Sequence, residues 1–506
     1  MYKKVTTLFM TIIAALILLS PNTNFVIAND KELTGLNNNY LNQIKPSDIE
    51  CQKNSEKIEI IYPLSTVPAL VEKNTSFNIV FKAPNFENVY AYISTAYEPV
   101  IDEIWLNIEN IYLEDDTWKI SANVPLSTHE ELYNLSIIVV IDGKNYKNSC
   151  PRSVSVFNEF SDTFTFAHIT DLHIGDPRGF LESISQTIGY KSIKRCIDEI
   201  NLLHPDFVII SGDLVYGQLY PFEYSIEYKI CYDMIQKFDV PTFLCPGNHD
   251  GYYKFREDGL SFWKNYFGPL NYSFDYGNYH FLSINSFDMP AFFRLTISFI
   301  PMNWGGSISQ KQLSWIQQDL NESENDLTFM FMHHNPLWET TKDSLIGKTY
   351  ENRQELLFLI DSHDIDMVLA GHVHYDSVNI VNDTIFITTT TPESKIENED
   401  GYWGYRLVEI ENGKIVSYNY KEPKYSIPSY KLSHKIWTSQ NAASAEITNQ
   451  LDKNLEILIK FVMPKDNYIA ENGSIIMQRY DDNNVEIYVI AEIQGISVKI
   501  VTINKV

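Results

Sequence analysis

Residues 164–173 read Phe-Thr-Phe-Ala-His-Ile-Thr-Asp-Leu-His, an apolar stretch of strand length that runs directly into Asp171 and His173. Four later apolar stretches also end in short polar sequences, which are Gly212-Asp213, Gly247-Asn248-His249-Asp250, His333-His334 and Gly371-His372-Val373-His374. Segments with the apolar spacing of helices lie between several of them. This alternation of strand, loop and helix predicts an α/β domain built on buried strands.

The polar sequences at the ends of these strands carry the donor groups of a metal centre. In layered α/β domains, the loops beyond the carboxyl ends of the strands are where sites assemble. Carboxylate, imidazole and amide groups without a thiolate suit Fe, Mn, Zn or Ni. One carboxylate can bridge two ions, and a pair of ions about 3.5–4 Å apart can hold both ends of a phosphoryl displacement.

Taken in order, the five polar sequences resemble those of the calcineurin-like metallophosphoesterases, over about residues 162–410. The sequence Gln312-Leu313-Ser314-Trp315, in a segment predicted to be helical, also resembles sequences of this family. The resemblance implies a four-layer αββα sandwich and hydrolysis of phosphomonoesters or phosphodiesters, nucleotides among them. It further implies two divalent or trivalent metal ions (Fe, Mn, Zn or Ni) and attack by a hydroxide that bridges them.

The resemblance also implies a role for each donor. The first ion would be held by Asp171, His173 and His374, the second by Asn248, His333 and His372, and Asp213 would bridge the two. His249 would protonate or stabilise the leaving oxygen, and Asp250 would orient the His249 imidazole.

Two ligand positions have competing candidates. In this family the first histidine of such a pair usually binds the metal, so His333 is favoured as the ligand. His334 would then lie behind His333 or face the substrate. Gly212-Asp213-Leu214-Val215-Tyr216 also fits a block of purple acid phosphatases in which the tyrosine binds ferric iron. Because His173 would occupy the same coordination position, we expect Tyr216 to be a packing residue. His168 and His280 lie in apolar segments that are predicted to form strands, so we expect both side chains in the core.

The aromatic stretch 288–306 has two interpretations. It is either a lid over the metals, with Arg294 meeting the substrate phosphate, or a loop that packs against a flanking β domain. Trp338 is a further candidate for the pocket wall.

The regions outside the α/β domain differ in character. Lys3 and Lys4 precede an apolar run and a small residue, Ala28, so residues 1–28 are predicted to be a secretory signal peptide, with an uncleaved anchor as the alternative. Export makes the protein secreted or extracytoplasmic, and no later segment is long and apolar enough to span a membrane. A linker at 29–55, an immunoglobulin-like β-sandwich at 56–158, the phosphoesterase domain at 159–420 and a C-terminal β domain at 421–506 complete the prediction.

This layout resembles that of purple acid phosphatases. Cys51 and Cys150 bracket the first β domain and could pair after export.

The net charge of the chain limits the classes of molecule that it can bind. The chain of 506 residues has 39 Lys and Arg against 65 Asp and Glu, a net charge of −26, which argues against nonspecific nucleic-acid binding. A small phosphorylated substrate remains compatible, because bound metal ions reverse the local field. The alternative function is a catalytically inactive binding protein whose β domains recognise a cell-surface ligand. No ligand position is missing, which favours a metal-dependent phosphoric ester hydrolase.

Overall fold

The computed structural model describes residues 45–52, 55–177, 183–218, 222–254, 257–298, 306–338, 350–392, 403–421 and 423–506. The predicted signal peptide 1–28 and most of the linker 29–55 lie outside the described residues, as does part of the aromatic stretch 288–306. None of the described helices combines the length and the apolar character needed to span a membrane.

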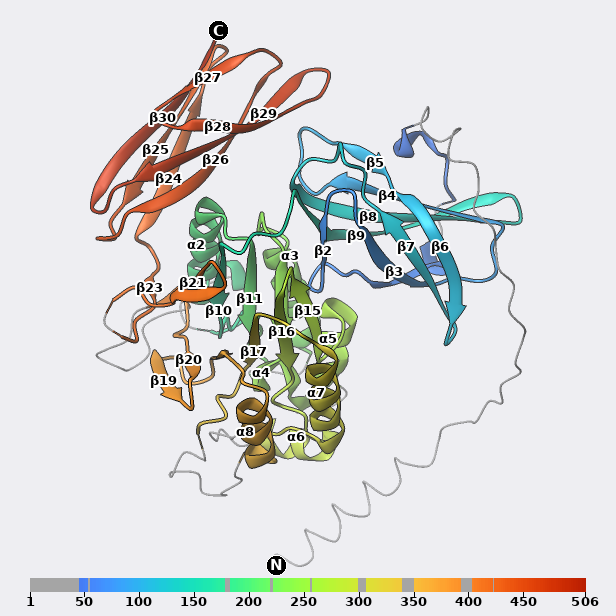
Figure 1. The fold of residues 1–506 in the computed structure, drawn as a ribbon, viewed down its shortest axis with the longest axis vertical. Helices are drawn as coiled ribbons and strands as arrows, with labels where there is room; N and C mark the ends of the chain where they lie inside the picture. Colours follow the sequence, from blue (N-terminus) through green and yellow to red (C-terminus); the bar gives the residue numbers. More distant parts are fainter. Residues whose placement is uncertain are drawn as a thin grey trace, which may run out of the picture. The chain divides into compact units, whose positions relative to one another are not determined.

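The region after the linker is a sandwich of two sheets (Figure 1). One sheet has the order β1 (Glu59–Tyr62), β3 (Ser76–Lys82), β7 (Thr117–Asn123), β6 (Asn107–Glu114). The other has the order β2 (Ala69–Glu72), β9 (Lys144–Phe157), β8 (Glu131–Ile141), β4 (Asn88–Thr95), β5 (Glu103–Trp105). Alternate residues of β3 and β7, among them Ile79 and Ile120, are fully buried in the shared core. Cys51 and Cys150 are both free thiols, so the proposed pairing is wrong for this structure.

Two six-stranded sheets form the α/β region. The first has the order β12 (Thr242–Cys245), β11 (Phe207–Ser211), β10 (Phe164–Ile169), β21 (Gly404–Glu411), β22 (Lys414–Ser417), and β23 (Ile427–Pro428) pairs with β21. The second has the order β15 (Tyr272–Tyr276), β16 (Tyr279–Ile284), β17 (Leu327–Met332), β18 (Met367–Ala370), β20 (Thr384–Thr388), β19 (Ser377–Val381). Strands β10, β11 and β12 are parallel, as are β16, β17, β18 and β20.

The alternation within β11 shows how the layers stack. Phe207 and Ile209 belong to an aromatic core that joins the two sheets, with Phe281 and Phe329 opposite. Val208 and Ile210, pointing the other way, pack with helices α2 (Ile188–Leu203) and α3 (Tyr224–Ile235). Helices α7 (Gln310–Glu322) and α8 (Arg353–Ser362) pack on β17 and β18 in a separate core. This arrangement confirms the predicted αββα sandwich.

Shorter elements complete the α/β region. The helices are η4 (Ile184–Gln186), α4 (Asn248–Gly251), α5 (Gly259–Phe267) and α6 (Ala291–Ser298), and β13 (Tyr253–Lys254) pairs with β14 (Glu257–Asp258). Ahead of the first sandwich lie the single turns η2 (Pro46–Asp48) and η3 (Ser55–Lys57).

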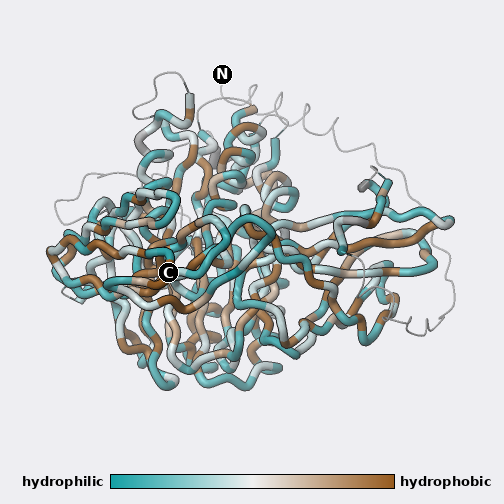
Figure 2. The backbone as a smooth tube through the Cα atoms, turned by 90° about the horizontal axis from the view of Figure 1, so that it is seen from above, coloured by the Kyte–Doolittle hydropathy of each residue, from teal (hydrophilic) through white to brown (hydrophobic). Residues whose placement is uncertain are grey.

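The C-terminal region is a second all-β unit. Its sheets are β24 (Leu432–Thr438), β25 (Ala442–Asn449), β30 (Ser497–Lys505), β27 (Tyr468–Glu471) and β26 (Leu455–Pro464), β29 (Asn484–Ile493), β28 (Ser474–Tyr480). Every second residue of β26 from Leu455 to Met463 is buried, as its apolar alternation predicts. Figure 2 shows hydrophobic strand segments joined by hydrophilic connections in this and the other regions.

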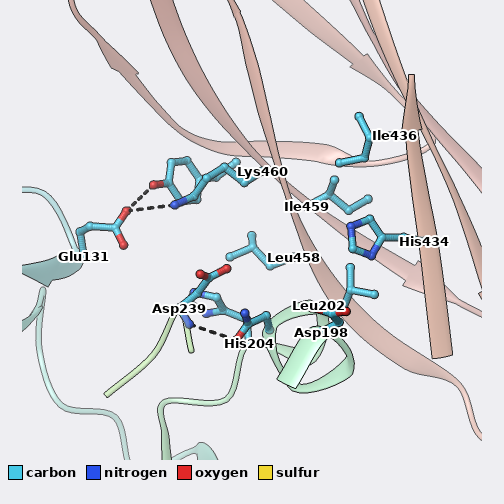
Figure 3. A pocket seen from close by; sticks show the side chains of 12 residues that line it. Glu131, Asp198, Leu202, His204, Asp239, His434, Ile436, Leu458, Ile459 and Lys460 are labelled. Atoms are coloured by element: carbon cyan, nitrogen blue, oxygen red, sulfur yellow. Dashed lines mark hydrogen bonds and ion pairs between the residues drawn. The ribbon is translucent and has the colours of Figure 1, made fainter. Parts of the chain in front are cut away.

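A cavity of about 210 Å³ is lined by residues of all three regions, among them Glu131, Asp239 and Lys460 (Figure 3). The Lys460 ammonium lies 3.9 Å from the Glu131 carboxylate. None of the residues predicted to hold metal or substrate lines this cavity, so the chemistry must be sought at the strand ends instead.

Candidate metal centre

The predicted ligands come from both sheets and meet at one edge. Asp171 and His173 follow β10, Asp213 follows β11, and Asn248 follows β12. His333 and His334 follow β17, while His372 and His374 follow β18. Because these strands run parallel within their sheets, their carboxyl ends bring the loops together. Four overlapping groups of potential donor atoms result, each within 4.8 Å: Asp171-His173-His374, His173-Asp213-His249, Asp171-Asp213-His333 and His333-His334-His372.

Tight backbone turns make this convergence possible. Asp171, His173, Asp213, His372 and His374 all have positive φ, between 46° and 78°. Non-glycine residues rarely adopt this conformation, and such strain collects at functional sites. Gly212, at φ 89°, precedes one of them, and a Cβ there would lie 2.8 Å from the His333 Nδ1 atom. A side chain at this position would therefore push against a candidate ligand.

Asp213 and Asp171 both accept backbone N–H groups and both lie beside imidazoles. Asp213 Oδ1 accepts the backbone N–H of His249 at 2.8 Å. Its Oδ2 lies 3.0 Å from His333 Nε2, 3.3 Å from His173 Nε2 and 3.9 Å from His249 Nε2. Asp213 thus stands at the centre of the group, where a bridging ligand would have to be.

Asp171 repeats this arrangement. Its Oδ2 accepts the backbone N–H of His372 at 2.9 Å and the Thr170 hydroxyl at 2.8 Å. Its Oδ1 lies 3.1 Å from His374 Nε2 and 3.9 Å from His173 Nε2. The structure therefore brings the three predicted ligands of the first ion together.

The adjacent histidines His333 and His334 both belong to the donor set. His333 Nδ1 donates to the Ser211 carbonyl at 2.8 Å, which turns its Nε2 toward Asp213. His334 Nδ1 is bonded to the Ser286 hydroxyl at 2.9 Å, and its buried Nε2 has no hydrogen-bond partner. Since His334 is 2% exposed and groups with His333 and His372, it is a second candidate ligand.

Two buried side-chain atoms that could coordinate a metal have no hydrogen-bond partner, and they test whether a metal fits here. They are His334 Nε2 and the Asn248 side-chain oxygen Oδ1. Buried polar atoms in folded proteins are nearly always satisfied, so each exception needs an explanation. A cation bound by nitrogen and oxygen donors would satisfy both, and the donor set fits such an ion.

The charged groups of the centre shift one another's pKa values. Burial opposes ionisation of Asp171 and Asp213, but the neighbouring imidazoles outweigh it and hold the pKa of both carboxyls below its usual range. Burial also opposes protonation of His333, yet Asp213 and Asp171 raise its pKa to about 9. Burial and the nearby His333 lower the pKa of His372 to about 3. The carboxylates are therefore ionised, as ligands must be.

The predicted role of Asp250 needs correction. Its Oδ1 accepts the backbone N–H groups of Leu214 and Val215 at 2.9 and 3.1 Å, and its Oδ2 accepts that of Gly247 at 2.8 Å. The carboxylate thus braces the loop after Asp213 and the start of α4. The His249 imidazole is instead fixed through Nδ1, which donates to the Tyr216 carbonyl at 2.5 Å.

Arg294, which was predicted to contact the substrate, has protein partners in this structure. The Arg294 guanidinium is buried and paired with the Asp258 carboxylate at 2.6 and 3.1 Å. It also donates to the carbonyls of Met289 and Gly251 at 3.1 and 2.8 Å. Arg294 therefore ties α6 to the chain around α4 and α5.

The remaining sequence candidates lie beside the centre or in the core. The Tyr216 ring stands edge-on to His173, with centroids 6.1 Å apart. The Trp338 ring lies 6.3 Å from Tyr375, the residue that follows His374. His168 and His280 are buried, as predicted.

Sequence reasoning missed residues that support the ligands from behind. Ser211 fixes His333 through its backbone carbonyl, which no side-chain pattern reveals. Tyr252 receives an N–H of the Asn248 amide at 2.8 Å. Its place four residues after Asn248 was the available signal for this contact.

The family comparison agrees with this geometry. The sequence profile described as calcineurin-like phosphoesterase matches residues 164–376. The chain contains a calcineurin-like phosphoesterase domain. This confirms the predicted superfamily and the predicted class of enzyme, a metal-dependent phosphoester hydrolase.

Similar proteins carry related names. A probable glycerophosphodiester phosphodiesterase of Arcobacter nitrofigilis is 28% identical over 210 residues, which cover 41% of this chain and 71% of that one. A 3′,5′-cyclic-nucleotide phosphodiesterase of a Nostoc species is 25% identical over 220 residues, covering 42% and 72%. A purple acid phosphatase structure from yellow lupin aligns with a TM-score of 0.40 at 12% identity, covering 74% of this chain and 70% of that one.

Proposed function

We propose that this protein is an exported phosphodiesterase that uses two metal ions held by the phosphoesterase domain. The observation that carries the proposal is the central position of Asp213 between two donor groups. Asp213 shares one group with His173 and another with Asp171 and His333, and these residues also belong to the groups Asp171-His173-His374 and His333-His334-His372. Support for export comes from the basic and apolar segment that ends at Ala28.

The residues divide into two ligand sets around Asp213. Asp171, His173 and His374 would hold the first ion, while Asn248, His372 and His333 would hold the second, with His334 as an additional donor. Bound ions of this kind neutralise phosphoryl oxygens and activate water. The protein supplies fixed directions for these donors, since each carboxylate has one oxygen anchored to backbone N–H.

The His249 ring has one nitrogen fixed by the backbone and the other turned to the centre. A carbonyl cannot donate a hydrogen bond, so the contact with Tyr216 places a proton on Nδ1 and leaves Nε2 facing Asp213. Burial lowers the pKa of His249 to about 4, which favours the neutral imidazole. We therefore assign the His249 Nε2 atom to hydrogen bonding with the nucleophile, the substrate or the leaving oxygen.

Two observations favour a diester over a monoester. The similar proteins from Arcobacter and Nostoc are named phosphodiesterases. In addition, the Arg294 guanidinium is neutralised by Asp258 and does not offer a charge to the substrate. A diester brings one negative charge to the centre, whereas a monoester brings up to two, so the diester needs less compensation from the protein.

The experiment compares two synthetic esters on the purified, metal-analysed protein. With Mn, Ni or Zn added, bis-p-nitrophenyl phosphate should be hydrolysed with a higher kcat/KM than p-nitrophenyl phosphate. Faster monoester hydrolysis would reverse the assignment of substrate class. Bound metal without turnover of either ester would support the binding-protein alternative. N-terminal sequencing of secreted protein should begin at Asn29, directly after Ala28.

A further inference from the structure

The phenol oxygen of Tyr252 receives two side-chain N–H groups. Asn248 Nδ2 donates to it at 2.8 Å, and Gln218 Nε2 donates at 3.1 Å. Tyr252 is 3% exposed, and its ring packs against His249 at 5.2 Å and Phe287 at 6.0 Å. Gln218 lies in the loop after Asp213, so one hydroxyl joins the loops that carry two candidate ligands.

The contact fixes which atom of the Asn248 amide is engaged by the protein and which is left free. With Nδ2 bound to Tyr252, the amide oxygen Oδ1 points away from it, buried and without a partner. An amide has a nitrogen that only donates and an oxygen that accepts, so only the oxygen can bind a cation. The orientation of this amide therefore decides whether Asn248 can act as a ligand.

We propose that Tyr252 is a positioning residue that holds the Asn248 amide with its oxygen presented to the second metal ion. The inference rests on the proposed function in one respect, the use of Asn248 as a ligand. It adds a residue outside the ligand set and gives it a separate, measurable task. Residues that orient metal ligands change metal affinity or activity about 10–100-fold when they are removed.

The test is a calorimetric titration of metal-free protein with Mn²⁺, comparing wild type with Tyr252→Phe. We expect affinity at one of two sites to fall about 10–100-fold, while the site that uses Asp171, His173 and His374 keeps its affinity. The matched control is Tyr228→Phe, because that hydroxyl is equally buried but donates only to the backbone carbonyls of Asp250 and Gly259. Thermal melting of both variants measures the structural cost of losing a hydroxyl.

A rescue variant separates orientation from packing. A carboxylate offers an oxygen in either rotamer, so Tyr252→Phe should weaken the second site less than about threefold in the Asn248→Asp background. Wild-type affinity at both sites in Tyr252→Phe would overturn the inference, as would equal losses in Tyr228→Phe. If wild type binds two ions but hydrolyses no diester, the proposed function fails while the role of Tyr252 is still decided by the titration.

Discussion

Two clusters of carboxylates and imidazoles in this chain differ in how completely their polar atoms are hydrogen-bonded. The first is the metal centre around Asp213. The second, called here the His280 clamp, consists of Asp275 on β15, His280 on β16 and Asp319 on α7. In the clamp, His280 Nδ1 lies 2.6 Å from Asp275 and Nε2 lies 2.9 Å from Asp319, and the Ser273 hydroxyl donates to Asp319 at 2.7 Å.

The comparison teaches how to distinguish a structural cluster from a binding site. Both ring nitrogens of His280 have acidic partners, so the clamp satisfies the hydrogen bonds of its imidazole and ties a hairpin to a helix. The metal centre keeps His334 Nε2 and Asn248 Oδ1 buried and unpartnered, and five of its residues adopt positive φ. Buried polar atoms without hydrogen-bond partners, together with backbone strain, distinguish the cluster that is built for a ligand.

The largest effect is expected when the central carboxylate of the metal centre is replaced. Asp213→Asn should lower kcat for bis-p-nitrophenyl phosphate by on the order of 1,000-fold, because it removes the charge shared by two ions. Metal analysis should show loss of bound metal in the same variant. Near-normal kcat would refute the bridging position of Asp213.

Removal of metal should affect stability at the centre and leave the clamp untouched. Because ions bind the folded state, each ion present at 100 times the Kd of its site should stabilise the protein by about 2.7 kcal/mol over the chelated form. Denaturant unfolding with EDTA and with added Mn²⁺ measures this difference. The same difference should persist in His280→Gln, and its disappearance there would mean that the two clusters are not independent.

Breaking the clamp should cost stability without changing chemistry. His280→Gln removes hydrogen bonds to two carboxylates, and we expect a loss of about 1.5–3 kcal/mol in the free energy of unfolding. The kcat of the metal-loaded variant should stay within about twofold of wild type, since the clamp has no contact with the reaction. A large fall in kcat at full metal occupancy would contradict this separation.

The clamp should also give stability a defined pH dependence. Despite burial, the hydrogen bonds that the His280 ring donates to Asp275 and Asp319 raise its pKa from 6.5 to about 9 in the folded protein. Folding is therefore linked to proton uptake: the stabilisation is complete below pH 6.5 and is lost as pH rises through about 9. Unfolding measured between these values should show this decline in wild type, and the decline should be smaller in His280→Gln.

Substitution of Arg294 is expected to have the smallest effect on catalysis. Because its guanidinium is paired with Asp258, Arg294→Met should change kcat/KM by less than about threefold while lowering stability by about 1.5–3 kcal/mol. Steady-state kinetics at saturating metal measures the first quantity, and denaturant unfolding measures the second. If substrate binding weakened about tenfold or more in this variant, Arg294 would be restored as a substrate contact.

Much of the centre could be predicted from sequence because its donors occupy strand ends. Asp171, Asp213 and His372 each follow an apolar strand directly, and parallel strands place their carboxyl ends side by side. The errors concern residues whose partners lie far away along the chain. Arg294 meets Asp258 only after α6 and α5 have packed, and Asp250 meets Leu214 across two loops.

Hydrophobic periodicity and strand-end position are local properties, so the residues alone predicted an α/β domain on buried strands, the chemical types of the ligands and their order along the chain. The four αββα layers were implied by the resemblance to the phosphoesterase family. Tertiary structure alone decided which atom each side chain presents. It turned His333 through Ser211, His249 through Tyr216 and Asn248 through Tyr252. Those directions depend on hydrogen bonds between distant segments, which exist only once the two sheets and their loops have come together.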